Sequence, residues 1–272
     1  MNTAHTATLL PDGKVLGTGG ADADGAAISS AELYDPASGK FTPTGSMQTE
    51  RAGHTASLVS QPGQSGRVIV YAGSTWELWD EASGTFSAQG NMAAAQSEFP
   101  QPAALPDGRL VIAGGGNNDS TIATEQLLTL DSHFFALDHN LNVPRSAHTL
   151  TALSGTGDLL ALGGSDTVAL ASAELLDSNG WTLLPGKLST ARWSHTATLL
   201  PDGSVFVARG ENENGILTSS EFYLPKTQNF IAGPLVSPRG GKPRHSSRPA
   251  LLAWPRARIP RASARALPLP PQ

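Results

Sequence analysis

The segment HTATLLPDG at residues 5–13 decides the fold, because the chain repeats it letter for letter at residues 195–203. Weaker copies lie between the two: HTASL at 54–58, PAALPDG at 102–108 and HTLTAL at 148–153. The copies begin at residues 5, 54, 101, 148 and 195, so the spacing is 49 residues once and 47 residues three times. A constant period of this length indicates a row of similar supersecondary units that pack against one another.

The composition favours a fold of short strands joined by turns. The 272 residues include 29 Gly and 20 Pro, and only 15% of them are charged. All-β folds of this length are often a single domain. Because the chain has no cysteine, disulfides, thiolate metal sites and cysteine nucleophiles are excluded.

Each repeat is predicted to form four short strands. The first strand is the HTATLL segment, and the Pro-Asp-Gly that follows it is typical of a tight turn in which glycine takes a positive φ. The second strand is an aliphatic run that is apolar on both faces, as expected between two neighbouring units. These runs lie at residues 15–16, 68–71, 110–112, 159–162 and 205–207. The third strands lie at 31–35, 77–80, 173–177 and 220–223, and the fourth strands open on Phe41, Phe86, Phe134, Trp181 and Phe230.

These residues resemble the kelch motif, whose repeat is about 50 residues long. The wording AELYDP and PDG is similar to that of bacterial kelch and galactose-oxidase-like propellers. The matching positions are His5, His54, His148 and His195 in the first strand; Gly19, Gly20, Gly73, Gly114, Gly115, Gly163, Gly164 and Gly210 after the second; Tyr34, Trp79 and Tyr223 in the third; and Phe41, Phe86, Trp181 and Phe230 in the fourth. We expect the glycines to let the backbone turn sharply and pack closely against the next unit.

The resemblance covers residues 1–238 and implies an all-β fold, a β-propeller of four-stranded blades. About five blades are present, at residues 5–53, 54–100, 101–147, 148–194 and 195–238. The family commonly has six or seven blades, and this chain offers no spare strand to complete the last one. An unclosed array exposes two blade faces and their edges. The ring therefore closes with five blades, or pairs with another copy by self-association, or is part of something longer.

Residues 239–272 have a different character. They contain eight basic and no acidic residues, a net charge of +8, whereas ten basic and 23 acidic residues give the preceding part −13. The Pro- and Arg-rich composition predicts a disordered tail. However, RPALL at 248–252 resembles the start of a sixth first strand, so a change of reading frame near residue 252 is the second hypothesis. The arginines show no helical or aromatic-interleaved pattern, so nucleic acid is not expected as a partner.

The histidines at the starts of four repeats could form a ring that binds a metal. We favour a repeated structural hydrogen bond instead, because equivalent atoms in different blades lie too far apart to share one ion. Copper chemistry of the galactose-oxidase type is excluded, since it needs a cysteine-linked tyrosine. We therefore expect no catalytic residue, no metal and no cofactor.

Three further motifs have ordinary explanations. The DSNGW sequence at 177–181 resembles a sialidase Asp-box but coincides with the turn before the fourth strand. The GGGNND sequence at 114–119 lacks the lysine of a phosphate-binding loop. The acidic loops, with Asp22, Asp24, Asp119, Asp166, Glu211 and Glu213, could collect Ca²⁺ or a cationic partner, but solvated loop charge is our preferred interpretation.

The sequence thus predicts a non-catalytic binding or scaffold module that presents blade loops to a protein or carbohydrate ligand. The alternatives are a carbohydrate-active propeller enzyme domain and a truncated or frameshifted propeller fragment with no independent function. No residue set identifies the ligand. No apolar stretch reaches the roughly 18–20 residues that a membrane span requires. The chain starts without a signal peptide, although similar bacterial propellers are often exported.

Overall fold

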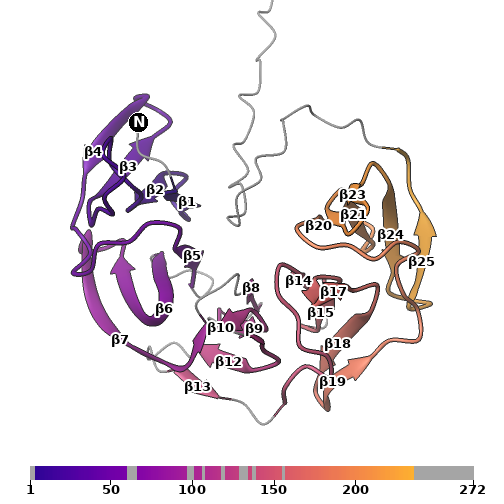
Figure 1. Cartoon of the computed structure of the whole chain (residues 1–272). Helices are drawn as coiled ribbons and strands as arrows, with labels where there is room; N and C mark the ends of the chain where they lie inside the picture. Colours follow the sequence, from indigo (N-terminus) through magenta and orange to yellow (C-terminus); the bar gives the residue numbers. More distant parts are fainter. Residues whose placement is uncertain are drawn as a thin grey trace, which may run out of the picture. The chain divides into compact units, whose positions relative to one another are not determined.

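The computed structural model describes residues 4–59, 66–96, 101–105, 108–117, 120–128, 134–136, 139–154 and 157–235. Within these residues every regular element is a β-strand, which confirms the all-β prediction (Figure 1). The chain divides into two compact units, Met1–Lys242 and Pro243–Gln272. The second unit and the predicted tail at 239–272 lie outside the described residues, so the two hypotheses about the tail stay predictions.

Four of the five repeats form a four-stranded antiparallel sheet whose strands are paired in chain order. Sheet 1 consists of β1 (Thr6–Leu9), β2 (Val15–Thr18), β3 (Ala31–Asp35) and β4 (Lys40–Pro43). Sheet 3 consists of β8 (Gln101–Ala104), β9 (Leu110–Ala113), β12 (Glu125–Leu128) and β13 (Phe134–Ala136). Sheet 4 consists of β14 (Thr149–Ala152), β15 (Leu159–Leu162), β18 (Ala173–Asp177) and β19 (Gly180–Leu183). Sheet 5 consists of β20 (Thr196–Leu199), β21 (Val205–Ala208), β24 (Ser220–Leu224) and β25 (Asn229–Ala232).

Sheet 2 differs from the prediction, because its second and third strands form one element. It contains β5 (Thr55–Leu58), the 14-residue β6 (Arg67–Asp80) and β7 (Thr85–Gln96). In Figure 1 β6 bends back on itself. Its Val68–Tyr71 part pairs with β5, and its Thr75–Asp80 part pairs with β7. The physical reason is a short connection: Gly73, at φ 62°, lies where the other repeats insert a long loop.

The corresponding loops of the other sheets form small projections. Two-stranded ribbons connect the second and third strands of sheets 3, 4 and 5. They are β10 (Gly116–Asn117) with β11 (Ser120–Thr121), β16 (Ser165–Asp166) with β17 (Val168–Ala169), and β22 (Glu211–Asn212) with β23 (Gly215–Ile216). In sheet 1 the same loop is closed by a single bridge between Ala21 and Ala27.

The Pro-Asp-Gly turns form as predicted where they can be described. Gly13 has φ 85° and donates its N–H to the Leu10 carbonyl at 3.0 Å. Gly203 has φ 84° and donates to Leu200 at 2.9 Å in the same way. The third such turn includes residues 106–107, which lie outside the described residues. These turns set the register of the first and second strands.

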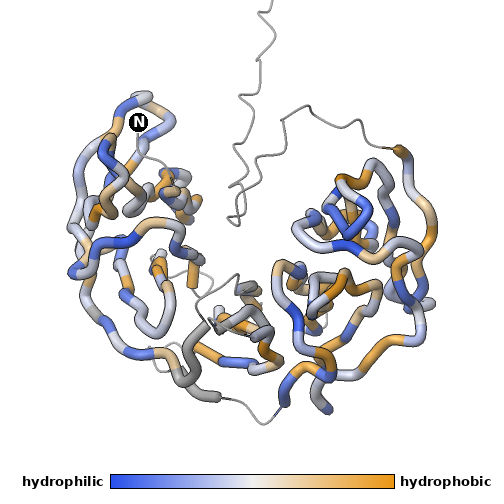
Figure 2. The backbone as a smooth tube through the Cα atoms, viewed as in Figure 1, coloured by the Kyte–Doolittle hydropathy of each residue, from blue (hydrophilic) through white to orange (hydrophobic). Residues whose placement is uncertain are grey.

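The hydrophobic core lies between successive sheets. Leu10 and Leu16 of sheet 1, for example, form one cluster with Val68, Val70 and Trp79 of sheet 2. Three similar clusters join sheets 2 and 3, 3 and 4, and 4 and 5. The second strands β9 and β15 are buried at every residue, as predicted for strands apolar on both faces. Figure 2 shows the hydrophobic segments within the sheets.

Candidate functional site

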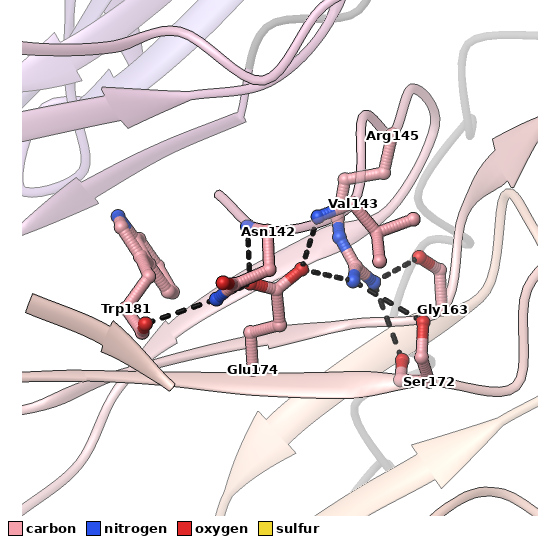
Figure 3. Close-up of polar contacts among 7 residues, drawn as sticks. All are labelled: Asn142, Val143, Arg145, Gly163, Ser172, Glu174 and Trp181. Carbon is pink, nitrogen blue, oxygen red and sulfur yellow. Dashed lines mark hydrogen bonds and ion pairs between the residues drawn. The ribbon is translucent and has the colours of Figure 1, made fainter. Parts of the chain in front are cut away.

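A buried ion pair connects sheet 4 to the segment that leads into it from sheet 3 (Figure 3). The Arg145 guanidinium donates to the Glu174 carboxylate at 2.6 Å, and both side chains are 0% exposed. The guanidinium also donates to the Gly163 carbonyl at 2.8 Å and to Ser172. The Glu174 carboxylate accepts the backbone N–H of Asn142 at 2.7 Å. These contacts hold the lead-in segment, which precedes the first strand, against the third strand.

The same ion pair recurs in two other sheets. Arg51 donates to Glu77 of sheet 2 at 3.2 Å, and Arg192 donates to Glu221 of sheet 5 at 3.0 Å. Backbone N–H groups of the lead-in segments again bond to these carboxylates, as Ser189 does to Glu221 at 2.8 Å. Buried charges are tolerated only when they are paired and hydrogen-bonded. The network is therefore a structural lock between successive sheets.

Sheet 3 carries the glutamate of this lock without the arginine. Glu125 is buried at the position of Glu174, but the residue 47 before Arg145 is Glu98, which lies outside the described residues. Trp181 of sheet 4 donates its indole N–H to the Glu125 carboxylate. Burial raises the pKa of Glu125 to about 7, and the hydrogen bond from Trp181 opposes that shift. This carboxyl therefore titrates near neutral pH.

The predicted histidines bond to the neighbouring sheet. The His54 Nε2 atom lies 2.8 Å from Thr6 Oγ1 and 3.1 Å from Thr18 Oγ1 of sheet 1. The His195 Nε2 atom lies 2.9 Å from Thr149 Oγ1 of sheet 4. Burial lowers the pKa of His54 to about 4 and that of His195 to about 3, so both are neutral at pH 7. The contacts are those of a repeated structural hydrogen bond.

His148 occupies the same position but lacks the hydroxyl. Both of its ring nitrogens are buried, and neither has a hydrogen-bond partner among the described residues. The residue that corresponds to Thr6 and Thr149 is Pro102, which has no side-chain donor or acceptor. The fourth histidine, His5, is exposed. Across the described residues, no group of three or more histidine, aspartate or glutamate side chains could hold a metal.

The glycines after the second strand pack against the next lead-in segment. A Cβ on Gly19 would lie 2.5 Å from the Arg51 carbonyl oxygen and 2.7 Å from the His54 ring. Gly114 and Gly163 are in the same situation. The second glycine of each pair donates its N–H to the same arginine carbonyl; the pairs are Gly20 to Arg51, Gly115 to Arg145 and Gly164 to Arg192. The close packing expected for these glycines is therefore present.

Two predicted glycine positions differ. A Cβ on Gly73 would meet no atom within 4 Å, because β6 bends there and the long loop is missing. In sheet 5 the first glycine is replaced by Arg209, which has φ 64°, and Gly210 packs on the Trp193 carbonyl and His195.

The predicted aromatic residues of the third and fourth strands lie together. Tyr34 and Phe41 have ring centroids 4.9 Å apart, and Tyr223 and Phe230 have centroids 5.2 Å apart. Trp79 is buried in the cluster between sheets 1 and 2, with Phe86 packed against it, and Trp181 is buried between sheets 3 and 4. The side chain of Phe134, in β13, lies outside the described residues. These aromatics belong to the packing between sheets.

A cleft of about 720 Å³ lies between sheets 4 and 5 and was not foreseen from the sequence. It is formed at the end of the sheets opposite the two-stranded ribbons, by the turns that join first to second and third to fourth strands. Its polar lining residues are Ser154, Asp158, Asp202, Ser204, Lys226, Thr227 and Gln228. Its apolar lining residues are Leu153, Leu175, Tyr223, Leu224 and Pro225.

Charge and hydrogen bonds organise one wall of this cleft. The Asp202 carboxylate accepts the backbone N–H of Ser204 at 2.9 Å and its hydroxyl at 2.6 Å. The hydrogen bonds from Ser204 lower the pKa of Asp202, so this side chain is ionised at neutral pH. Burial, together with the charge of Asp158, raises the pKa of Tyr223 and keeps its phenol neutral. The cleft thus combines negative charge, Lys226 and an apolar surface.

The acidic loop residues mostly serve their own loops. Asp22 accepts the backbone N–H groups of Asp24 and Ala26, and Asp177 accepts that of Asn179 as in an ordinary turn. Glu211 accepts the Trp193 indole N–H at 2.9 Å, and Glu213 accepts the backbone N–H of Ala169. Asp119 lies outside the described residues. These contacts explain most of the acidic residues without a bound cation.

Comparison with known proteins shows likeness at the level of the fold. No protein-family profile matches the chain, and no curated protein matches it. Among 377 matching solved chains is the structure of YjhT, with a TM-score of 0.65 and 12% sequence identity. The match covers 86% of this chain and 84% of YjhT. The shared feature is an all-β fold of several antiparallel four-stranded sheets, consistent with a β-propeller.

No helix in the described ranges is long and apolar enough to cross a membrane.

Proposed function

We propose that this chain is a non-catalytic binding module built from kelch-type propeller blades, and that the cleft between sheets 4 and 5 binds a carbohydrate. The composition of the cleft carries the proposal. Small-molecule sites are concave, have volumes of about 300–1,000 Å³ and combine apolar surface with a few convergent polar groups. The 720 Å³ cleft fits this description.

The lining of the cleft suits a sugar better than a purely apolar ligand. A sugar ring offers hydroxyl groups that both donate and accept, and an apolar face of C–H groups. Asp158 and Asp202 supply acceptors, Lys226 supplies donors, and Gln228 and Ser154 supply both. Leu224 and Pro225 supply apolar contact for the ring face.

Saturation-transfer difference NMR with glucose, galactose, maltose and lactose tests this proposal. We expect signal transfer to at least one of these sugars. We also expect Lys226→Ala to weaken binding about three- to tenfold, the effect of one lost hydrogen bond. Lys40→Ala is the matched control, because Lys40 is an exposed lysine on β4 of sheet 1.

Two results would contradict carbohydrate binding in this cleft. One is that no sugar receives signal, which agrees with a protein ligand or with a fragment that has no ligand of its own. The other is that Lys226→Ala and Lys40→Ala bind a sugar equally well, which places the sugar elsewhere on the molecule.

A further inference from the structure

Every interface between successive sheets uses two distinct faces. We call the face that packs on the preceding sheet the front face, and the face that packs on the following sheet the back face. In the cluster between sheets 1 and 2, Leu16 and Leu33 are on the back face of sheet 1. Val70, Trp79 and Phe86 are on the front face of sheet 2. Sheet 1 therefore has a front face, and sheet 5 a back face, that none of the described clusters covers.

The front face of sheet 1 carries the residue types of a buried interface. Leu9 and Phe41 are each 65% exposed, and Phe41 stacks on Tyr34. Their counterparts in sheet 2 are Leu58, Phe86 and Trp79, all of which pack in the cluster between sheets 1 and 2. This face is thus built to be covered.

Glu32 adds a charge to this front face. It occupies the position of Glu77, Glu174 and Glu221, which are all buried in ion pairs with a lead-in arginine. Glu32 itself is exposed, and the residue three before His5, where the lead-in arginine would stand, is Asn2. An arginine supplied from elsewhere would complete this lock.

The back face of sheet 5 carries the complementary residues. Phe206 and Phe222 have ring centroids 5.0 Å apart and occupy the positions of Leu16 and Leu33. Thr196 is exposed at the position where Thr6 and Thr149 bond to the histidine of the next sheet. Both the apolar and the polar contacts of a sheet interface are therefore available.

Arg239 supplies the matching charge. It follows Arg192 by 47 residues, the same interval that separates Arg145 from Arg192, so it holds the lead-in position after sheet 5. It is also the first of the eight basic residues that end the chain. Among the lead-in arginines it is the one that has no third-strand glutamate of a following repeat, since the residue 47 after Glu221 is Pro268.

We infer that two copies of this chain associate head to tail, with the front face of sheet 1 of one copy on the back face of sheet 5 of the other. Glu32 then pairs with Arg239 of the second copy, as Glu174 pairs with Arg145 within the chain. Because the two faces differ, the contact is heterologous and can continue to a third copy. The inference does not depend on carbohydrate binding.

Arg209 is the one residue of this back face that departs from the pattern. In the described interfaces the first glycine lets the arginine carbonyl of the lead-in segment approach to where a Cβ would clash. Arg209 puts a side chain there, which prevents the segment around Arg239 from seating fully. We therefore expect weak association in the natural chain and tighter association in Arg209→Gly.

Cross-linking tests the contact directly, because the chain has no cysteine of its own. One preparation carries Glu32→Cys, another carries Arg239→Cys, and the two are mixed and treated with a short bismaleimide. We expect a cross-linked dimer in the mixture, well above the amount from either variant alone or from Arg239→Cys mixed with Lys226→Cys. Equal yields in all samples would overturn the inference. So would a double variant that yields only cross-linked monomer, which shows that the chain closes on itself.

A measurement of mass by light scattering provides the second test. The mean mass of the natural chain should rise with concentration, and that of Arg209→Gly should rise at lower concentration. Phe41→Asp should remain a monomer, and it should fold because Phe41 is already exposed. A natural chain that is monomeric at every concentration, or a Phe41→Asp chain that associates as the natural one does, refutes the head-to-tail contact.

Discussion

Arg145 and Glu174 show how single residues hold the repeats together, because each charge is buried and compensated by the other and by backbone groups. We expect Arg145→Met to lower the free energy of unfolding by about 3–5 kcal/mol, since it leaves Glu174 buried and unpaired. Urea denaturation measures this loss. The double variant Arg145→Met/Glu174→Leu should recover part of it, and Lys40→Met should cost almost nothing. A loss below about 1 kcal/mol for Arg145→Met would show that the pair behaves as a surface ion pair.

His148 offers a second test at the scale of one residue. Its Nε2 atom lacks the threonine hydroxyl that His54 and His195 receive, because Pro102 stands in that place. Pro102→Thr should supply the hydroxyl and make the protein more stable than Pro102→Val by about 0.5–1.5 kcal/mol, one net hydrogen bond. Valine has the shape of threonine without the hydroxyl, so the difference isolates the bond. Equal stability of the two variants would rule out this bond.

At the scale of elements, the ribbon of β16 and β17 contains a strained turn. Thr167, between the two strands, has φ 63°, which is unfavourable for a β-branched residue. Thr167→Gly should raise the free energy of unfolding by up to about 1 kcal/mol. Thr42→Gly, the same change within the exposed strand β4, should lower it by a similar amount. Thermal melting of both variants checks this opposition of sign, and a lower melting temperature for Thr167→Gly would contradict it.

The strands of this fold could be predicted from the sequence because their signals are local. Aliphatic runs, Pro-Asp-Gly turns and the 47-residue spacing all lie within short windows, and four of the five sheets follow them. Sheet 2 departs because its loop is reduced around Gly73, which merges two strands into β6. The glutamates of the lock were visible in the third strands, but alternation suggested that they face solvent.

The rest required packing between elements. Glu174 is buried because Arg145, 29 residues earlier, reaches it across the lead-in segment. The signal that could have found these arginines is their constant place three residues before His54, His148 and His195. No such signal exists for the cleft, whose residues run from Leu153 to Gln228 and meet only when sheets 4 and 5 stack.

At the scale of the whole molecule, the buried histidines couple the stability of several sheets to pH. Burial lowers the pKa of His54 to about 4 and of His195 to about 3, and it lowers that of His148 well below the ordinary value. An unfolded chain binds these protons below a pH of about 6.5, whereas the folded chain does not. The unfolded state then holds more protons, so stability falls on acidification by about 1.4 kcal/mol per pH unit for each histidine.

Glu125 acts in the opposite direction, and its effect sets the size of the net change. Its pKa in the folded chain, about 7, is above the ordinary value of 4.5, so the folded state binds this proton first as the pH falls. That gain is lost again as the pH rises from about 4.5 to 7, and it offsets about one of the three histidines. Between pH 6.5 and 4.5 the chain should therefore lose stability with a slope that corresponds to about two protons.

Urea denaturation at pH 7, 6 and 5 measures this slope. His195→Gln should flatten it by about one proton, and Glu125→Gln should steepen it by about one, because each variant removes one titrating group. His5→Gln is the matched control and should leave the slope unchanged, since His5 is exposed. If stability is constant from pH 7 to 5, or if His195→Gln and His5→Gln have equal slopes, the imidazoles of the sheet interfaces are not held neutral by their burial.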